Sequence, residues 1–210
     1  TTDEELERVL PVVMELLRRG VLVSIDTSKP AVMQACIAAG VHMVNDVYAL
    51  RAAGAVETVA ASQVAVCLMH MQGEPRTMQR EPRYADVVAE VREFLGGRVA
   101  ACRQAGIEPS RMLIDPGFGF GKTPAQNLML VRDLAKVAAL GYPVLLGTSR
   151  KSTLGLVLDE PDPLRRGPGN DVTAAWGIAQ GCSMLRVHDV AAIRPVVRMA
   201  DALRQAPRTA

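Results

Sequence analysis

A single carboxylate between an apolar run and a glycine-rich loop is the most chemically suggestive feature of the sequence. Residues 112–114 read Met-Leu-Ile, and Asp115 follows them, before Pro116 and three alternating glycines. A short apolar run bounded by turn residues is typical of a strand buried on both faces. Pro116 ends the strand ladder because it has no N–H, and glycines allow a ligand to approach the backbone. The stretch predicts a ligand-binding acid at the carboxyl end of a parallel strand.

Two phosphate-binding patterns are similar to this loop but do not match it. A P-loop has four residues between its first glycine and its Gly-Lys-Ser/Thr, whereas three separate Gly117 from Gly121, which precedes Lys122 and Thr123. A dinucleotide fingerprint is Gly-x-Gly-x-x-Gly, but the glycines here alternate and follow Asp-Pro. For this stretch alone, a flexible loop after an ordinary strand stays open as an alternative.

Polar residues follow five other apolar runs of the chain in the same way. They are Asp26, Asn45, His70, Ser149 with Arg150 and Lys151, and Arg186 with His188. The carboxyl ends of parallel strands meet at one edge of a sheet, and a site fed by every strand end is typical of the (β/α)8 barrel. The alternative is an open doubly wound sheet, which usually binds its ligand with one or two loops at a switch point.

The apolar periodicity predicts strands and helices that alternate along the chain. We expect strands over residues 21–25, 41–44, 64–69, 112–114, 143–146 and 184–187. We expect helices over residues 3–19, 30–39, 51–62, 84–105, 124–140, 153–159, 172–181 and 190–203, and loops over 74–83 and 160–170. The prediction is an α/β fold, a single barrel domain over residues 1–210. A barrel has eight strands, so we expect its first two to lie outside this chain.

Composition excludes several classes of function. Of the 210 residues, 24 are Lys or Arg and 22 are Asp or Glu, and this balance argues against a nucleic-acid or membrane-surface protein. Aromatic residues make up only 3% of the chain, too few for stacking platforms. The four cysteines are far apart in apolar surroundings, so we expect buried thiols and a reducing, cytoplasmic location. The sequence has no run of about 18 apolar residues that would span a membrane.

Taken together, the strand ends resemble those of the dihydropteroate synthase family. The matching segments are residues 24–29, 44–46, 67–73, 113–122, 147–152 and 185–189. The resemblance implies a (β/α)8 barrel and a transferase of folate biosynthesis that joins a dihydropterin diphosphate to p-aminobenzoate, releasing diphosphate. It also implies Mg²⁺ as cofactor, a homodimer packed through late barrel helices, and competition by sulfonamides at the aminobenzoate site.

The resemblance assigns three polar residues to the pterin ring. Asp115 matches the carboxylate that binds the aminopyrimidinone edge, and a carboxylate can accept two parallel N–H bonds there. The alternative is a structural ion pair with a nearby Arg or Lys. Asn45 offers a donor and an acceptor to the other heteroatoms, and its alternative is a turn-forming residue. Asp26 matches a second ring-binding acid, and its alternative is a helix cap before Pro30.

The remaining site residues come from the later strand ends. Lys151 supplies a point charge for a ring carbonyl or nitrogen, and Ser149 resembles the residue that binds the aminobenzoate carboxylate. Arg186 and His188 alternate along the last predicted strand, so both can face the barrel mouth and bind diphosphate. Three further residues complete the expected substrate site: Met69 and Phe120 by apolar contact, and Gly147. We interpret Lys151, Arg186 and His188 as catalytic residues, and His42 and His70 as structural.

The chain departs from the family pattern in two respects. The first-loop Asn that helps hold Mg²⁺ and diphosphate and the Ser-Thr-Arg-Pro segment of the second loop are absent, and residues 165–170 are unusually rich in proline and glycine. Two rival functions stay open. One is a methyltransferase barrel acting on methyltetrahydrofolate and a corrinoid, although that reaction has no diphosphate for Arg186 and His188 to bind. The other is a non-catalytic remnant that binds pterin or a partner.

Overall fold

A computed structural model describes residues 1–74, 77–78 and 80–206. The chain divides into two compact units. Unit 1 comprises residues 1–70 and 94–115, and unit 2 comprises residues 71–93 and 116–210. Both units contain parallel strands and helices, and the predicted α/β alternation along the chain is confirmed. The prediction of a single domain over residues 1–210 stays a prediction.

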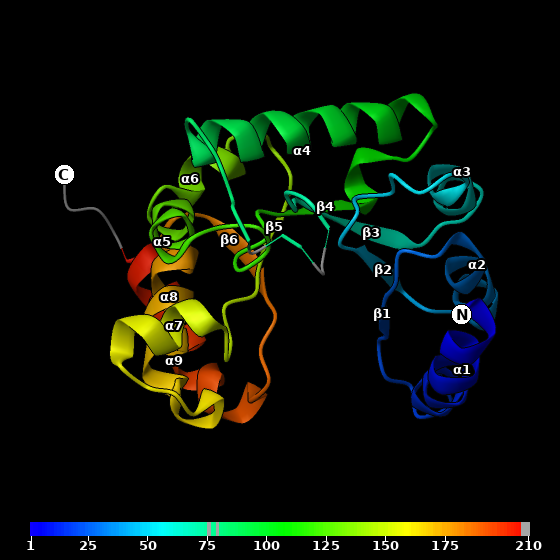
Figure 1. Ribbon diagram of the computed structural model, residues 1–210. Helices are drawn as coiled ribbons and strands as arrows, with labels where there is room; N and C mark the ends of the chain where they lie inside the picture. The colour runs from blue at the N-terminus through cyan, green and yellow to red at the C-terminus, as the bar shows by residue number, and fades with distance from the viewer. Residues whose placement is uncertain (75–76, 79, 207–210) are drawn as a thin grey trace. The chain divides into compact units, whose positions relative to one another are not determined.

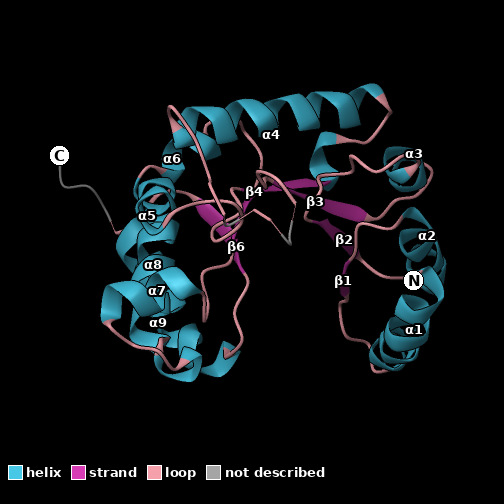
Figure 2. Cartoon of the chain, in the orientation of Figure 1, coloured by secondary structure: helices cyan, strands magenta, loops and turns pink. Residues whose placement is uncertain are grey.

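The described residues form six strands and nine α-helices (Figures 1 and 2). The strands are β1 (Ser24–Asp26), β2 (Met43–Asp46), β3 (Ala65–Met69), β4 (Met112–Asp115), β5 (Val144–Leu146) and β6 (Cys182–Leu185). The helices are α1 (Thr2–Arg18), α2 (Pro30–Ala39), α3 (Ala55–Ala60), α4 (Val87–Gln104), α5 (Pro124–Arg132), α6 (Leu134–Ala138), α7 (Ser152–Leu158), α8 (Gly167–Ala179) and α9 (Val190–Gln205). Two short 3₁₀ turns, Pro109–Arg111 and Pro163–Arg165, complete the elements.

Unit 1 contains a parallel ladder in the order β1-β2-β3-β4. One row of paired residues, Ile25, Val44, Val66 and Met112, is buried. Figure 1 shows α1, α2 and α3 along one side of β1 to β3. Because side chains alternate along a strand, the residues between those of the buried row point to the opposite face of the ladder. That opposite face carries the candidate site residues of this unit.

Unit 2 pairs β5 with β6 in parallel and packs its helices beside them. Helix α8 packs on α9, α5 and β6. The centre of this unit is apolar: the fully or almost fully buried side chains are Leu130, Leu134, Val137, Val144, Leu146, Leu154 and Ile178. Gly177 of α8 faces Leu146 so closely that a Cβ there would lie 2.6 Å from the Leu146 Cδ2. Any side chain at residue 177 would therefore force the buried Leu146 side chain to move.

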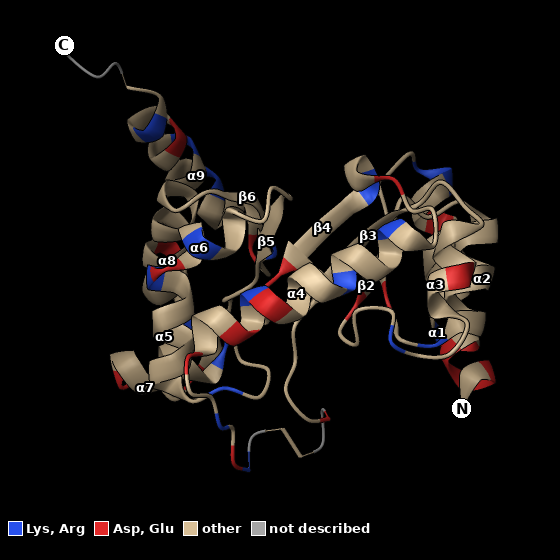
Figure 3. Cartoon of the chain, turned by 90° about the horizontal axis from the view of Figure 1, so that it is seen from above, with Lys and Arg blue, Asp and Glu red and all other residues tan. Residues whose placement is uncertain are grey.

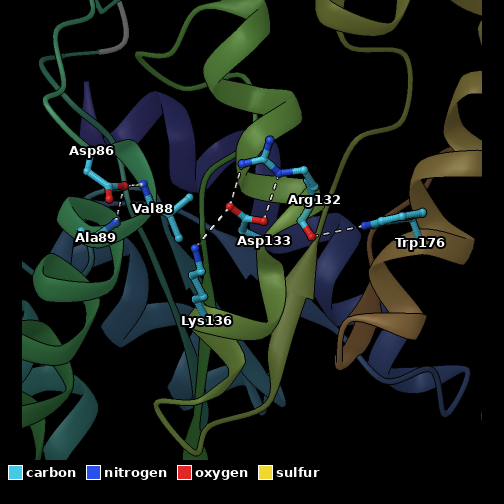
Figure 4. Close-up of polar contacts among 7 residues, drawn as sticks. All are labelled: Asp86, Val88, Ala89, Arg132, Asp133, Lys136 and Trp176. Carbon is cyan, nitrogen blue, oxygen red and sulfur yellow. Dashed lines mark hydrogen bonds and ion pairs between the residues drawn. The ribbon is translucent and has the colours of Figure 1, made fainter.

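The predicted helices occur, with several corrected ends. Helix α2 begins and ends at the predicted residues, before Gly40 in the left-handed conformation. Helix α1 is capped by Thr1 in a capping box with Glu4, one residue earlier than expected. Helix α3 covers only the middle of the predicted 51–62 helix. Helix α4 begins at Val87, because the Asp86 carboxylate accepts hydrogen bonds from the backbone N–H groups of Val88 and Ala89 in the first turn (Figure 4).

Three predictions from the second half of the chain are wrong. The helix expected over residues 124–140 is two helices, α5 and α6, which meet at Asp133, where ψ is 24°. The loop expected over residues 160–170 contains a 3₁₀ turn and the start of α8 at Gly167. Pro168 suits that first turn because it needs no hydrogen-bond partner there. The last strand is Cys182–Leu185, two residues earlier than expected.

All four cysteines are buried, as predicted. Within the described residues, no helix is both long and apolar enough to cross a membrane. Figure 3 shows basic and acidic residues interspersed along α4, in keeping with the balanced composition. The predicted loop over residues 74–83 falls partly on residues 75, 76 and 79, which lie outside the described residues.

Candidate functional site

The candidate residues of unit 1 share one face of its ladder. Asp26 of β1 pairs with Asn45 of β2, and Met69 of β3 pairs with Asp115 of β4. Asn45 also pairs with Cys67, which lies two residues before Met69, and residues two apart on a strand point to the same face. The ladder therefore brings two carboxylates, one amide and one thioether to a single face, at the carboxyl ends of its strands.

Asn45 is held by one bond and has one open polar atom. Its Nδ2 donates to the Asp26 Oδ2 at 3.0 Å, and only 3% of the residue is exposed. Its Oδ1 is buried without a hydrogen-bond partner among the described residues. Because an unsatisfied buried acceptor costs about 1–3 kcal/mol, this oxygen is suited to a donor from a ligand. Asn45 lies in a strand rather than in a turn, so the alternative interpretation of this residue is wrong.

Asp26 does not cap the following helix. The residue before α2 is Lys29, and no side chain caps the helix there. The carboxylate of Asp26 is instead exposed at the end of β1, where it accepts from Asn45. Met69 and Asp115 are both buried, with 3% and 8% of each residue exposed. The two predicted acids therefore differ in solvent exposure, because Asp115 is buried and Asp26 is exposed.

Asp46 supports this face, a role that the sequence did not reveal. It is fully buried, and its carboxylate accepts from the Ser28 hydroxyl and from the backbone N–H groups of Tyr48 and Leu50 at 2.9 Å and 2.7 Å. It therefore ties the loop after β1 to the loop after β2. An adjacent Asn-Asp pair at a strand end is the only sequence signal of this arrangement, and it does not say which residue faces the ligand.

The loop after β2 contains local backbone strain. Ala49 and Leu50 both have φ above +50°, which costs energy for residues with side chains. Both are buried, and the Arg98 guanidinium donates to their carbonyl oxygens at 2.8 Å and 3.1 Å. Arg98 and Asp46 together hold this turn in place directly after Asn45.

In unit 2 the glycine loop surrounds the Lys151 ammonium. The Lys151 Nζ donates to the Phe118 carbonyl oxygen and lies 4.7 Å from the centre of the Phe120 ring. Gly119, at φ +81°, lies under the Lys151 side chain, and a Cβ there would sit 3.0 Å from the Lys151 Cδ. The loop thus positions a cation over an aromatic ring, an attractive geometry. The structure brings together two predicted residues, Phe120 and Lys151.

Two further buried residues, Lys122 and Asn127, form hydrogen bonds with the glycine loop. Lys122, only 2% exposed, donates from its Nζ to the carbonyl oxygens of Gly117 and Phe120 at 2.9 Å each. Asn127, 1% exposed, accepts from the Gly119 N–H at 2.7 Å and donates to the Thr153 hydroxyl at 2.9 Å. The sequence assigned no role to Asn127, because nothing in its pattern shows that this helical residue faces a loop.

Ser149 and His188 contact each other. The Ser149 hydroxyl oxygen lies 2.9 Å from the Nδ1 of the His188 ring. The backbone N–H of His188 donates to the same oxygen at 3.4 Å. Arg186 and His188 are exposed and follow β6 rather than lying within it, so their predicted alternation along a strand is wrong. The backbone N–H of Arg186 still donates to the Leu146 carbonyl at 3.0 Å, which holds this segment beside β5.

Gly147 is buried beside this segment. A Cβ at Gly147 would lie 3.5 Å from the Arg186 Cβ, an ordinary contact, so the structure itself does not require a glycine there. The two histidines interpreted as structural have structural contacts. The His70 ring packs edge-on against Phe94, and the His42 Nδ1 accepts from the Val23 N–H at 3.1 Å.

Metal-binding side chains do not cluster in the part of the chain that the structure describes. It contains no group of three or more His, Cys, Asp or Glu placed to hold a metal ion. Mg²⁺ binding through one or two protein groups together with substrate phosphates needs no such cluster.

Comparison with known proteins gives a consistent family match. The model of the family "Pterin binding enzyme" matches residues 1–188. The chain is 44% identical to the dihydropteroate synthase of Neisseria meningitidis serogroup C over 204 residues, which are 96% of this chain and 72% of that protein. It is 42% identical to the dihydropteroate synthase of Escherichia coli K12, over 96% of this chain and 72% of that protein.

Solved structures agree with the sequence comparison. Dihydropteroate synthase from Stenotrophomonas maltophilia, with imidazole bound in the active site, has a TM-score of 0.95 at 44% identity, over 99% of this chain and 79% of that one. The enzyme from Xanthomonas albilineans in complex with 7,8-dihydropteroate has a TM-score of 0.92 at 43% identity, over 99% of this chain and 78% of that one.

Proposed function

We infer the activity of this chain from its family, because it belongs to the pterin-binding enzymes and, among them, to the dihydropteroate synthases. Its fold class is that of the (β/α)8 barrel, of which the described residues contain six βα units. It is a transferase of folate biosynthesis that condenses 6-hydroxymethyl-7,8-dihydropterin diphosphate with p-aminobenzoate. The products are 7,8-dihydropteroate and diphosphate.

The reaction exchanges one bond for another at the pterin methylene carbon. The bond from this carbon to the diphosphate oxygen breaks, and its electron pair leaves with the diphosphate. The lone pair of the arylamine then forms the new carbon–nitrogen bond, and the amine loses one proton. No nucleophilic side chain is required, so the protein contributes by positioning the substrates and by stabilising the charge on the leaving group.

We assign binding of the pterin ring to the ladder face of unit 1. The supporting observation is the open acceptor of Asn45, whose Oδ1 is buried without a partner among the described residues. The Asn45 Nδ2 is already held by Asp26, so the amide orientation is fixed before a ligand arrives. The Asp115 carboxylate lies on the same face and accepts the paired N–H groups of the ring edge.

We assign charge stabilisation and the second substrate to unit 2. The exposed guanidinium of Arg186 can bind diphosphate oxygens through two N–H groups. His188 can donate a hydrogen bond to the same group, and Ser149 can donate to the aminobenzoate carboxylate. Lys151 supplies a cation to the pterin ring, beside the Phe120 ring that contacts the flat substrates.

Mg²⁺ remains a prediction from the resemblance. No step of the reaction is assigned to the ion. A cytoplasmic location is likewise still a prediction.

A homodimer is supported by one surface of unit 2. A groove of about 760 Å³ between α8 and α9 is lined mainly by apolar residues. Its lining includes Ala175, Ala179, Pro195, Val196 and Met199, and Met199 is 61% exposed. We propose that a second copy covers this face. Light scattering on the full-length protein tests it: a monomer at micromolar concentration would contradict the proposal.

The activity is tested by product formation. Purified full-length protein, supplied with the dihydropterin diphosphate, p-aminobenzoate and Mg²⁺, is expected to form dihydropteroate and diphosphate. A sulfonamide should compete with p-aminobenzoate. Pterin binding without any turnover would instead favour a non-catalytic protein. Methyl transfer from methyltetrahydrofolate to a corrinoid, with no dihydropteroate formed, would favour the rival methyltransferase function.

A further inference from the structure

Asn127 is a buried polar residue that contacts two residues next to Lys151, Gly119 and Thr153. It lies in the first turn of α5, where its backbone N–H donates to the Thr123 carbonyl at 3.0 Å. Its side chain points away from solvent, with 1% of the residue exposed. Neither the family match nor the resemblance assigns a role to this residue.

The Asn127 amide has a single possible orientation. The Gly119 N–H can only donate, so the atom 2.7 Å from it must be the oxygen Oδ1. The Nδ2 then faces the Thr153 hydroxyl at 2.9 Å and the Lys122 carbonyl oxygen at 3.4 Å. One side chain therefore connects the glycine loop to α7.

Both connections lead to Lys151. Gly119 lies directly under the Lys151 side chain, since a Cβ on it would be 3.0 Å from the Lys151 Cδ. Thr153 lies two residues after Lys151, which is the N-cap of α7. The cation is thus supported through its side chain by the loop and through its backbone by the helix, and Asn127 joins the two supports.

We propose that Asn127 is a positioning residue that sets the place of the Lys151 ammonium over the Phe120 ring. The proposal rests on the proposed function, in which Lys151 binds the pterin ring. Loss of Asn127 removes the bonds that join the Gly119 N–H to the Thr153 hydroxyl, and the loop and α7 can then shift independently. Displacements of about 1 Å near a reacting group are enough to lower affinity and rate markedly.

The test measures binding of the dihydropterin diphosphate by calorimetry in the full-length protein. Asn127→Leu removes the amide at similar volume, and we expect the dissociation constant to rise about tenfold. Thr153→Val removes only the link to α7 and should give a smaller rise. Thr153→Ser keeps the hydroxyl and should recover most of the loss. Gln126→Ala is the matched control, because it weakens the capping box at the same helix end without contacting Gly119.

A double-mutant cycle separates positioning from general destabilisation. If Asn127 acts through Lys151, Asn127→Leu should add little to the loss already caused by Lys151→Ala. Additive losses, or a Thr153→Val protein that binds like the wild type, would overturn the inference. Failure of the wild-type protein to bind the dihydropterin diphosphate would instead overturn the proposed function, so the two failures are distinguishable.

Discussion

The site residues of unit 1 lie on strands, whereas those of unit 2 lie on loops. Asp26, Asn45, Met69 and Asp115 belong to β1 to β4, and their backbones are fixed by the parallel ladder. By contrast, the site residues of unit 2 all lie outside β5 and β6: Phe120, Gly147, Ser149, Lys151, Arg186 and His188. Their places depend on bonds between loops and buried side chains.

This difference matches the chemistry assigned to each unit. A flat ring with fixed donors and acceptors is recognised by groups whose directions are set in advance, as strand residues are. A diphosphate is recognised mainly by charge, which the exposed Arg186 can supply from a loop. The comparison predicts that loss of the Asp115 carboxylate on the unit 1 ladder weakens pterin binding, while loss of the Ser149 hydroxyl in unit 2 affects the second substrate.

The largest effect is expected from Asp115→Asn. The new amide has nearly the same shape, but it replaces one acceptor oxygen by a donor that faces the N–H groups of the ring. We expect the dissociation constant of the dihydropterin diphosphate to rise about 100-fold. Calorimetry measures this directly. Asp3→Asn makes the same carboxylate-to-amide change at an exposed residue of α1 outside the site, so it is the control and should bind normally. A change below threefold for Asp115→Asn would contradict the assignment.

A smaller and different effect is expected from Ser149→Ala. This change removes the hydroxyl that contacts His188 at 2.9 Å. The KM for p-aminobenzoate should rise about tenfold, since a hydrogen bond to a charged group is lost. Binding of the dihydropterin diphosphate alone should be unchanged. Ser149→Thr keeps the hydroxyl and serves as the control. An equal loss of pterin binding would show that the contrast between the units is wrong.

The same contrast explains what could be predicted from the sequence. The alternation of strands and helices, with a polar residue after each apolar run, predicted that Asp26, Asn45 and Asp115 lie at the ends of parallel strands. In the structure these three residues do share one face of the ladder. The segment that carries Arg186 and His188 was expected to be a strand, because its apolar residues alternate as in a strand. The structure ends β6 at Leu185, before either residue.

Supporting residues were harder to predict, because their roles depend on tertiary contacts. Asp46 and Asn127 look like ordinary turn and helix residues in the sequence, yet both are almost completely buried and accept bonds from loops. The start of α8 was missed for a local reason. Gly167 and Pro168 indicate a loop by composition, although proline also suits the first turn of a helix.

Glu5 of α1 holds the loop after β1 by two polar contacts outside the candidate site. Its carboxylate accepts from the Thr27 hydroxyl and pairs with the Lys29 ammonium at 2.8 Å. Burial raises the pKa of Glu5, but the bonds from Lys29 and Thr27 outweigh it, so the pKa lies below its ordinary value. The ionised form is therefore favoured by folding. The stabilisation of the fold by ionised Glu5 is fully present above the unfolded-state pKa of this carboxyl. It is lost as the pH falls through the folded-state pKa.

We expect Glu5→Gln to lower the free energy of unfolding by about 1 kcal/mol at pH 7. Urea denaturation at several pH values measures the difference, which should shrink as the wild-type carboxyl becomes protonated. Glu7→Gln is the matched control, since Glu7 lies in the same helix and has no hydrogen bond or ion pair with the described residues. A difference between wild type and Glu5→Gln that persists unchanged at acidic pH would contradict this explanation.

Asp133 in unit 2 shows the same direction of pKa shift beside more exposed cations, so the smallest effect on stability is expected there. The Arg132 guanidinium donates to both carboxylate oxygens, at 3.0 Å and 2.9 Å, and Lys136 lies 3.4 Å away (Figure 4). The bonds from Arg132 lower the pKa of Asp133 to about 2, against the effect of burial, with Lys136 adding to the decrease.

Both cationic side chains are more than 60% exposed, so salt screens the attraction. NMR titration should place the Asp133 midpoint near pH 2, and Arg132→Gln should raise it. The stabilisation is present above the unfolded-state pKa and lost as the pH falls towards 2. At pH 7, Asp133→Asn should leave the urea midpoint unchanged within error, unlike Glu5→Gln. An equal loss in both variants would mean that the exposure of the cationic partners does not distinguish the two carboxylates.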